Sequence, residues 1–298
     1  MNQSMRKENF AWKATAHIVL ASLTVLTVLP FVLLISASVT EERSVIANGY
    51  SLIPPAFSLA AYEYILAEWG QIGRAYGVTV LVTVIGTTVS LLITSMFAFG
   101  LLQKGVPGLK VILILLLVTM LFNGGIVPTY YVYTRILQVR NTLFGLIVPN
   151  LLMNAFTVIL VMAYIRHNVP AELFEAAEMD GANLFHIFFR IVAPLSTPIL
   201  ATVGLLTAIT YWNDWINGLY YITKPELYTI QLLLNQINQN ITFLASNASK
   251  LGNVDLRSLP SATIRMAIVV VAILPILLAY PFFQKYFAKG IALGAVKG

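Results

Sequence analysis

The sequence has no cysteine, few histidines and few charged residues. Without cysteine the chain can form neither a disulfide framework nor a thiolate metal site. Its histidines, His17, His167 and His186, do not show the spacing of metal ligands. Aspartate, glutamate, lysine and arginine together make up 10% of the chain, whereas a soluble domain carries roughly 25%. These shortages argue against a metal site and against a fold surrounded by water.

The remaining composition is strongly apolar. Hydrophobic residues account for 58% of the 298 positions, and the mean hydropathy is +0.82. A helix needs roughly 20 apolar residues to cross a bilayer core about 30 Å thick, and six uncharged windows reach that length. We therefore expect an all-α polytopic membrane protein, a single transmembrane domain over residues 1–298, with spans at about 14–39, 76–102, 111–134, 142–165, 192–219 and 264–284.

Two windows need separate treatment. The window 227–249 is uncharged but rich in asparagine and glutamine, whose amides would be left unpaired in lipid at a cost of several kcal/mol each. We expect it in an extracytoplasmic loop, 222–262, where a binding protein could dock. The first apolar window follows Arg6, Lys7 and Lys13, but it is longer than the roughly 7 to 15 residues of a signal-peptide core. It is therefore expected to remain as the first span.

Charge distribution bears on topology and partners. With six spans both termini lie on one side. Cytoplasmic termini place ten of the 18 lysines and arginines inside and eight outside, which agrees with the positive-inside rule. The net charge of +6 is spread along the loops and forms no groove-sized cluster, so we expect a lipid bilayer and no nucleic acid as partner. The expected location is a bacterial inner membrane.

The loop 166–191, between the fourth and fifth expected spans, contains the clearest local patterns. Pro170 fits the first turn of a short helix. Gly181 can adopt a positive φ and end that helix, and Asn183 can cap a second one. Pro194 would then bend the entry into the fifth span. The sequence thus predicts a short helix held across the membrane surface.

This short helix would present small and acidic side chains. Its carboxylates are Glu172, Glu175, Glu178 and Asp180, and its alanines are Ala176 and Ala177. Small side chains let a partner's surface come close, and carboxylates can accept paired hydrogen bonds from a partner's arginine. The pattern favours a docking helix. An interfacial helix resting on lipid headgroups is the alternative, although an anionic inner leaflet would repel an acidic face.

The loop resembles the EAA loop of ABC importer permeases, which reads EAA, three residues, glycine, nine residues, and then isoleucine, two residues and proline. The matching positions are Glu175, Ala176, Ala177, Gly181, Ile191 and Pro194, with Asp180 and Ala182 beside the glycine. The segment 289–298 resembles the tail of carbohydrate importers. The string 122–130 resembles permeases for complex oligosaccharides or polysaccharide fragments such as alginate. The resemblance extends over essentially the whole chain.

The resemblance implies the fold and the partners of a type I ABC importer permease. Such an importer has two permease subunits, here expected to be related but non-identical chains, two ATP-binding subunits and an extracytoplasmic solute-binding protein. In that family the EAA helix inserts into a cleft of the ATP-binding subunit. The role carries over to Glu175, Ala176, Ala177, Asp180, Gly181 and Ala182, with Glu172 and Glu178 on the same helix.

ATP is expected on the partner subunits. The sequence contains no G-x-x-x-x-G-K-[ST] phosphate loop. We therefore expect this chain to bind no cofactor and to carry no ATPase site, and we expect ATP and Mg²⁺ to be held by the ATP-binding subunits.

Candidate residues for a sugar path lie in the spans. The fifth span ends in Trp212, Asn213, Asp214, Trp215 and Asn217. Aromatic faces can stack on sugars and amides can bond their hydroxyls, but an aromatic belt at the outer headgroups would look the same. Polar residues also occur in the third and fourth spans at Asn123, Asn150 and Asn154. These asparagines can either pack helices together or line a passage.

Three other functions fit less well. An ion-coupled transporter or channel needs ionisable residues in its spans, and apart from Asp214 these spans offer almost none. A membrane-embedded enzyme needs a nucleophile with a base, or a metal helix, and neither pattern occurs. An importer of the same family for amino acids, metals or phosphate stays open. We expect a permease subunit of an ATP-driven importer that moves a carbohydrate from a binding protein into the cytoplasm.

Overall fold

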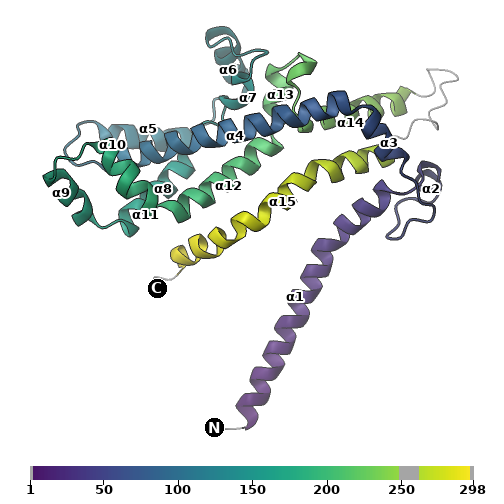
Figure 1. Ribbon diagram of the computed structural model, residues 1–298, viewed down its shortest axis with the longest axis horizontal. Coiled ribbons are helices and arrows are strands. Elements are labelled where there is room, and N and C mark those ends of the chain that lie inside the picture. Colours follow the sequence, from purple (N-terminus) through teal and green to yellow (C-terminus); the bar gives the residue numbers. More distant parts are fainter. Residues whose placement is uncertain (1–2, 248–261, 296–298) are drawn as a thin grey trace. The chain divides into compact units, whose positions relative to one another are not determined.

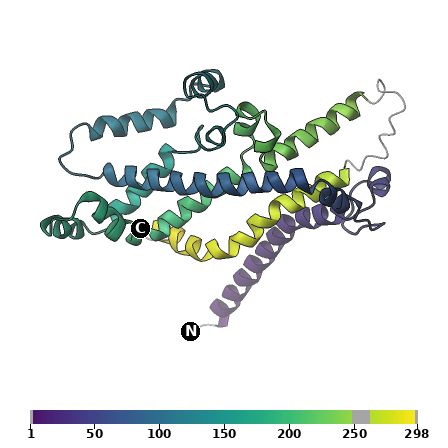
Figure 2. The same cartoon turned by 45° about the horizontal axis from the view of Figure 1, so that its top comes forward.

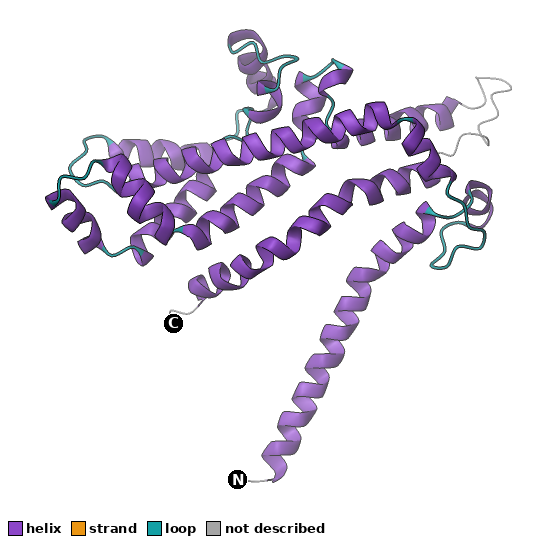
Figure 3. Ribbon diagram, viewed as in Figure 1, coloured by secondary structure: helices purple, strands orange, loops and turns teal. Residues whose placement is uncertain are grey.

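The computed structural model describes residues 3–247 and 262–295 (Figure 1). Its regular elements are all helices, and over the described residues there is no strand (Figure 3). The expected all-α class is confirmed. Residues 248–261 of the expected extracytoplasmic loop, and 296–298 of the tail, lie outside the described residues.

The helices have these bounds in chain order: α1 Gln3–Ser38, α2 Glu42–Asn48, α3 Ala60–Ala67, α4 Trp69–Gly100, α5 Leu109–Leu121, α6 Ile126–Tyr131, η1 Val132–Ile136, α7 Phe144–Ile147, α8 Ala155–Asn168, α9 Ala171–Met179, α10 Leu184–Ile187, η2 Phe188–Val192, α11 Ala193–Leu195, α12 Thr197–Asn213, α13 Ile216–Tyr221, η3 Pro225–Leu227, α14 Ile230–Asn247 and α15 Ala262–Ala295. η1 and η2 are π-helical turns and η3 is a 3₁₀ turn.

By length and composition, two described helices can each cross a bilayer alone, the segment Trp12–Ser38 of α1 and α4. Two more spans are available if bent pairs count as one each. Leu109–Leu121 meets Ile126–Ile136 at 116°, and Leu184–Leu195 meets α12 at 84°. The expected spans 142–165 and 264–284 contain the shorter helix α8 and part of α15. The number of six spans stays a prediction.

The third expected span is broken by its own sequence. Phe122 has extended backbone angles, and Gly125 has a φ of +84°, a value that favours glycine. Asn123 Oδ1 accepts a hydrogen bond from Gly125 N at 2.9 Å, which satisfies a backbone donor at the start of α6. The third expected span, 111–134, therefore contains two helical segments, because Asn-Gly-Gly forms a turn inside the apolar window.

The expected loop 222–262 also contains a helix. α14 runs from Ile230 to Asn247, and Leu232 and Leu233 near its start are buried. Its amides alternate with leucine and isoleucine at helical spacing, which gives the helix one apolar face and one polar face. The sequence analysis did not predict this helix, because the segment is rich in amide side chains. The side of the membrane on which α14 lies stays a prediction.

The chain divides into two compact units, Met1–Trp69 with Gln236–Leu274, and Gly70–Asn235 with Pro275–Gly298. In the first unit, Glu42 of α2 caps the start of α15. Its carboxylate accepts hydrogen bonds from the backbone N–H groups of Ala262 and Thr263, each at 2.9 Å, and from Thr263 Oγ1 at 2.6 Å. A carboxylate is favoured there because the first N–H groups of a helix lack partners inside the helix.

The second unit is built on α4, α5, α8 and α12. One apolar cluster joins the end of α4, at Ala98 and Phe99, to Val158 and Val161 of α8 and to Val203 of α12. α4 runs alongside α12 in both views (Figures 1 and 2). This apolar cluster packs against the loop 166–191 and holds the loop in place.

Candidate functional site

The expected docking helix is α9, and its ends are formed by local contacts. Pro170 precedes the helix in an extended conformation, so the helix begins one residue later than expected. At the other end Gly181 has a φ of +75°. Its N–H bonds the carbonyl of Glu178 at 3.0 Å, and the N–H of Ala182 bonds the carbonyl of Ala177 at 2.9 Å. This pair of bonds is a Schellman motif, which requires the positive φ that glycine tolerates.

The turn after α9 is capped as the sequence predicts. Asn183 Oδ1 accepts a hydrogen bond from the backbone N–H of His186 at 2.8 Å, so α10 starts directly after the Schellman turn. Further along, the helical segment Leu184–Leu195 meets α12 at an angle of 84°. Pro194 lies just before this bend, as expected for a residue that cannot donate a backbone hydrogen bond.

Phe174 anchors α9 to the rest of its unit. Phe174 packs on Phe99 of α4 with ring centroids 6.1 Å apart, and Phe99 also contacts Phe188 of η2 at 5.8 Å. These contacts fix α9 against the apolar cluster. Any displacement of α9 is therefore passed to the ends of α4 and η2 through packed rings.

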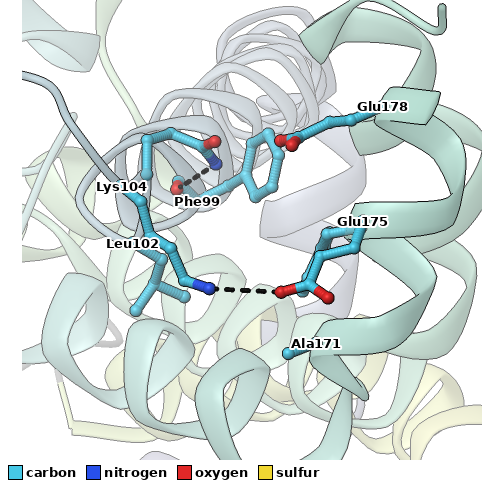
Figure 4. Close-up of a pocket in the computed structure, with 8 residues that line it drawn as sticks. Phe99, Leu102, Lys104, Ala171, Glu175 and Glu178 are labelled. Atoms are coloured by element: carbon cyan, nitrogen blue, oxygen red, sulfur yellow. Dashed lines mark hydrogen bonds and ion pairs between the residues drawn. The ribbon is translucent and has the colours of Figure 1, made fainter.

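A cation from the neighbouring loop lies over the same helix. Lys104 Nζ is 3.3 Å from Glu175 Oε1, with both side chains largely exposed, and the two residues line a small pocket beside Phe174 (Figure 4). An ion pair this exposed contributes at most about 1 kcal/mol.

The outward face of α9 carries the expected carboxylates and an unexpected apolar stripe. Glu172, Glu175, Glu178 and Asp180 are all exposed. Of the two alanines, Ala176 is exposed, whereas Ala177 packs inward against the apolar cluster. The expectation that both alanines are presented outward is therefore wrong for Ala177, because it lies three residues after the anchor Phe174.

The sequence reasoning missed the apolar side chains around Ala176. Met179 is 88% exposed, and Leu173, Leu184 and Phe185 are exposed as well. The sequence contains a signal for this second apolar stripe. Leu173 and Ala176 lie three residues apart, as side chains on one face of a helix do, and each comes directly before one of the inward-facing residues Phe174 and Ala177. Leu173, Ala176 and Met179 add apolar surface to the acidic helix, and apolar surface is typical of the core of a protein interface.

The second candidate site lies where α12 ends. Asp214 Oδ1 accepts hydrogen bonds from Ile216 N at 3.1 Å and Asn217 N at 3.3 Å, so this carboxylate caps α13. Asn217 is buried, and its Nδ2 donates to the carbonyl of Pro149 at 2.9 Å. Asp214 and Asn217 thus shape the turn between α12 and α13.

The two tryptophans of this segment separate. Trp212 is 7% exposed, and its ring lies 6.4 Å from that of Tyr76, so it is a packed side chain of the unit. Trp215 is exposed. Asn213 is exposed and donates to the carbonyl of Ile209 at 2.9 Å. The whole segment 212–217 therefore fits neither an aromatic belt at the headgroups nor a single sugar-binding surface, because adjacent side chains point in different directions.

A cavity of about 230 Å³ collects three of the expected path residues. Its walls include Asn123 from the break before α6, Asn150 from the turn before α8, and Asn217 of α13, together with Thr129 and Tyr220. Asn154 is not part of this cavity, because its Oδ1 caps α8 by accepting from Phe156 N at 2.8 Å. The fold thus brings together asparagines that the sequence places in three different spans.

Metal-binding chemistry has no support in the described residues. Within residues 3–247 and 262–295, no group of three or more histidine, cysteine, aspartate or glutamate side chains could hold an ion. The candidate sites are therefore surfaces and a cavity of hydrogen-bonding and aromatic groups. Such groups can bind and position a partner or a ligand.

Comparisons with known proteins agree with this chemistry. The chain is 41% identical over 271 residues to the polygalacturonan/rhamnogalacturonan transport system permease protein YtcP of Bacillus subtilis, covering 91% of this chain and 93% of that protein. It is 36% identical over 273 residues to Protein LplC of the same organism, covering 92% and 90%.

Among solved structures, a bacterial ABC transporter involved in the import of the acidic polysaccharide alginate contains a chain with a TM-score of 0.80 and 28% identity. The alignment covers 96% of this chain and 99% of that chain, so the type I permease fold is shared along almost its whole length. The family described as binding-protein-dependent transport system inner membrane component matches residues 13–293. With that match over nearly the entire sequence, the chain belongs to this family of membrane permease components.

Proposed function

We propose that this chain is the permease subunit of an ATP-driven importer that moves an oligosaccharide, such as a fragment of an acidic polysaccharide, into the cytoplasm. The observation that carries the proposal is α9, a short exposed helix that ends in a rigid glycine turn and is anchored to the spans through Phe174. The similarity to polygalacturonan and alginate transport proteins supports the choice of carbohydrate.

α9 has the surface of a docking helix. Exposed Leu173, Ala176 and Met179 supply apolar contact, and the surrounding carboxylates can accept hydrogen bonds from a partner's arginines. Phe174 lies on the opposite face and is packed into the unit. A partner that moves α9 would therefore move the ends of α4 and η2 with it.

The proposed complex contains four further proteins of three kinds. Two ATP-binding subunits dock on the cytoplasmic side and hold ATP and Mg²⁺, a second, related permease completes the path, and a solute-binding protein delivers the sugar outside. This chain contributes six spans, near 14–39, 76–102, 111–134, 142–165, 192–219 and 264–284. Both termini and the loop 166–191 lie in the cytoplasm of a bacterial cell, and 222–262 lies outside.

Purification of the assembled complex tests the proposal. We expect an ATP-hydrolysing subunit and a second permease to copurify with this chain. In proteoliposomes the complex should accumulate trigalacturonate only when ATP and the binding protein are both present. Accumulation driven by an ion gradient without ATP would contradict an ATP-driven importer, and accumulation of amino acids in place of sugar would contradict the substrate class.

Topology can be tested with a single thiol, because the chain contains no cysteine. In intact cells, a membrane-impermeant maleimide should fail to label Glu172→Cys, and it should label the same variant in inverted vesicles. Labelling of intact cells would place α9 outside the cytoplasm and would remove the basis for docking an ATP-binding subunit.

A further inference from the structure

The cavity between α6, the turn at Asn150 and α13 has a lining without any carboxylate, ammonium or guanidinium group. The nine residues that line it are Asn123, Gly125, Ile126, Thr129, Asn150, Ile216, Asn217, Tyr220 and Tyr221. The cavity has a volume of about 230 Å³ and is open on one side. A single sugar ring with its hydroxyl groups fits such a space.

One wall of the cavity offers a hydrogen-bond donor with a fixed direction. The carbonyl oxygen of the Asn123 side chain is occupied by Gly125 N at 2.9 Å. Among the described residues the Nδ2 of the same side chain has no partner, so it is free to donate. Asn150 has a φ of +60° and an exposed side chain that likewise makes no hydrogen bond within the described residues. Amide groups held in this way can bond ring oxygens and hydroxyls.

The opposite wall is aromatic and rigid. Tyr221 is buried and its ring stacks on Tyr130 with centroids 5.9 Å apart, while Tyr133 meets it edge-on at the same distance. Asn217 ties this wall to the carbonyl of Pro149, next to Asn150. The exposed Tyr220 lies beside this assembly. The walls come from three separate parts of the chain that contact one another, so the cavity is formed without a ligand.

We propose that this cavity is a subsite for one pyranose ring of the transported oligosaccharide, held by uncharged amide donors and a tyrosine face. The proposal rests on the proposed function and adds that this chain itself contacts the sugar. Amides and hydroxyls suit a moving substrate, because each net hydrogen bond is weak enough to be exchanged during passage. Because the lining holds no charged side chain, the hydroxyls, the apolar face and any carboxylate of the ring are contacted only by amide and hydroxyl groups and by tyrosine rings.

Substitution of Asn123 by aspartate removes the donor and adds a negative charge close to the anionic trigalacturonate. Asn123→Asp keeps the oxygen that accepts from Gly125 N, and it replaces the free Nδ2 by an anionic oxygen. With the assembled importer in proteoliposomes, we expect the trigalacturonate concentration for half-maximal uptake to rise roughly tenfold. The reason is that the amide donor of Asn123 is replaced by an acceptor oxygen, which would face the acceptor oxygens of the sugar. Asn48→Asp adds the same charge at an exposed residue outside the cavity lining, and a change below about twofold is expected there.

Thiol protection provides a second measurement that does not depend on transport rate. Trigalacturonate, with binding protein and Mg-ATP, should slow maleimide modification of Asn123→Cys several-fold relative to an untransported polyol. It should leave Tyr131→Cys unchanged, since Tyr131 is exposed on α6 but does not line the cavity.

The two proposals fail in different ways. If the unchanged importer takes up trigalacturonate but Asn123→Asp has the same half-maximal concentration and Asn123→Cys is not protected, the subsite is refuted and the importer function stands. If the unchanged importer takes up no oligosaccharide, the proposed function fails and the subsite falls with it.

Discussion

Gly86→Ala is expected to destabilise the protein, although alanine is the better helix former. Gly86 lies in the middle of α4, and a Cβ built on it would be 2.5 Å from Cζ and 2.6 Å from Cε1 of Tyr211. The Tyr211 ring cannot move aside easily. Its side chain is 1% exposed, and its hydroxyl donates to the carbonyl of Ile147 at 2.9 Å.

The expected magnitude follows from three contributions. Alanine in place of glycine stabilises a helix by about 0.5 to 1 kcal/mol. Overpacking against a rigid core costs about 1 to 3 kcal/mol, and loss of the Tyr211 hydrogen bond costs about 1 kcal/mol more. The net expectation is a loss of roughly 1 to 3.5 kcal/mol in the free energy of unfolding.

The matched control is Gly77→Ala in the same helix, where a Cβ would meet no atom within 4 Å. Heating both variants in one detergent, with tryptophan fluorescence as the measure of unfolding, should show Gly86→Ala melting below the unchanged protein and Gly77→Ala at or above it. A Tyr211→Leu background should reduce the effect of Gly86→Ala, because it removes the crowded ring. If Gly86→Ala melts as high as Gly77→Ala, the close contact between α4 and α12 is wrong.

Three further predictions concern the candidate sites. Gly181→Trp should abolish copurification of the ATP-binding subunit, whereas Gly181→Ala, with the same positive φ and a backbone strain of about 1 to 2 kcal/mol, should retain most of it; equal loss in both would point to strain and not to blocked docking. Trp212→Ala should lower the yield of folded protein, because removing a buried ring that packs on Tyr76 costs about 3 to 5 kcal/mol; an unchanged yield with slower uptake would instead assign Trp212 to the sugar path. Lys104→Ala should shift the melting temperature little, since its exposed ion pair with Glu175 contributes below about 1 kcal/mol; a large shift would refute that estimate.

The sequence by itself predicted the class of protein and the C-terminal end of α9. Composition excluded an aqueous fold because few charged residues are available to cover a surface. Gly181 and Asn183 marked the turn after α9, and the structure confirms both through a positive φ and a side-chain cap. These features depend on residues within a few positions of one another, so they can be read without knowing the rest of the fold.

Other features depended on tertiary contacts. Ala177 could be turned inward only because Phe174 packs on Phe99 of a distant helix. The polar segment that forms α14 buries its leucines against partners that no local pattern identifies.

What the sequence determined is therefore local: the apolar windows, the EAA pattern, and the glycine and asparagine that end helices. What only the tertiary structure decided is which separated residues meet. Asn123, Asn150 and Asn217 line one cavity. Asn154 instead caps its own helix, and Trp212 is buried outside the cavity lining. The physical reason is that the neighbours of a side chain depend on how helices far apart in the chain cross, and composition contains no information about that crossing.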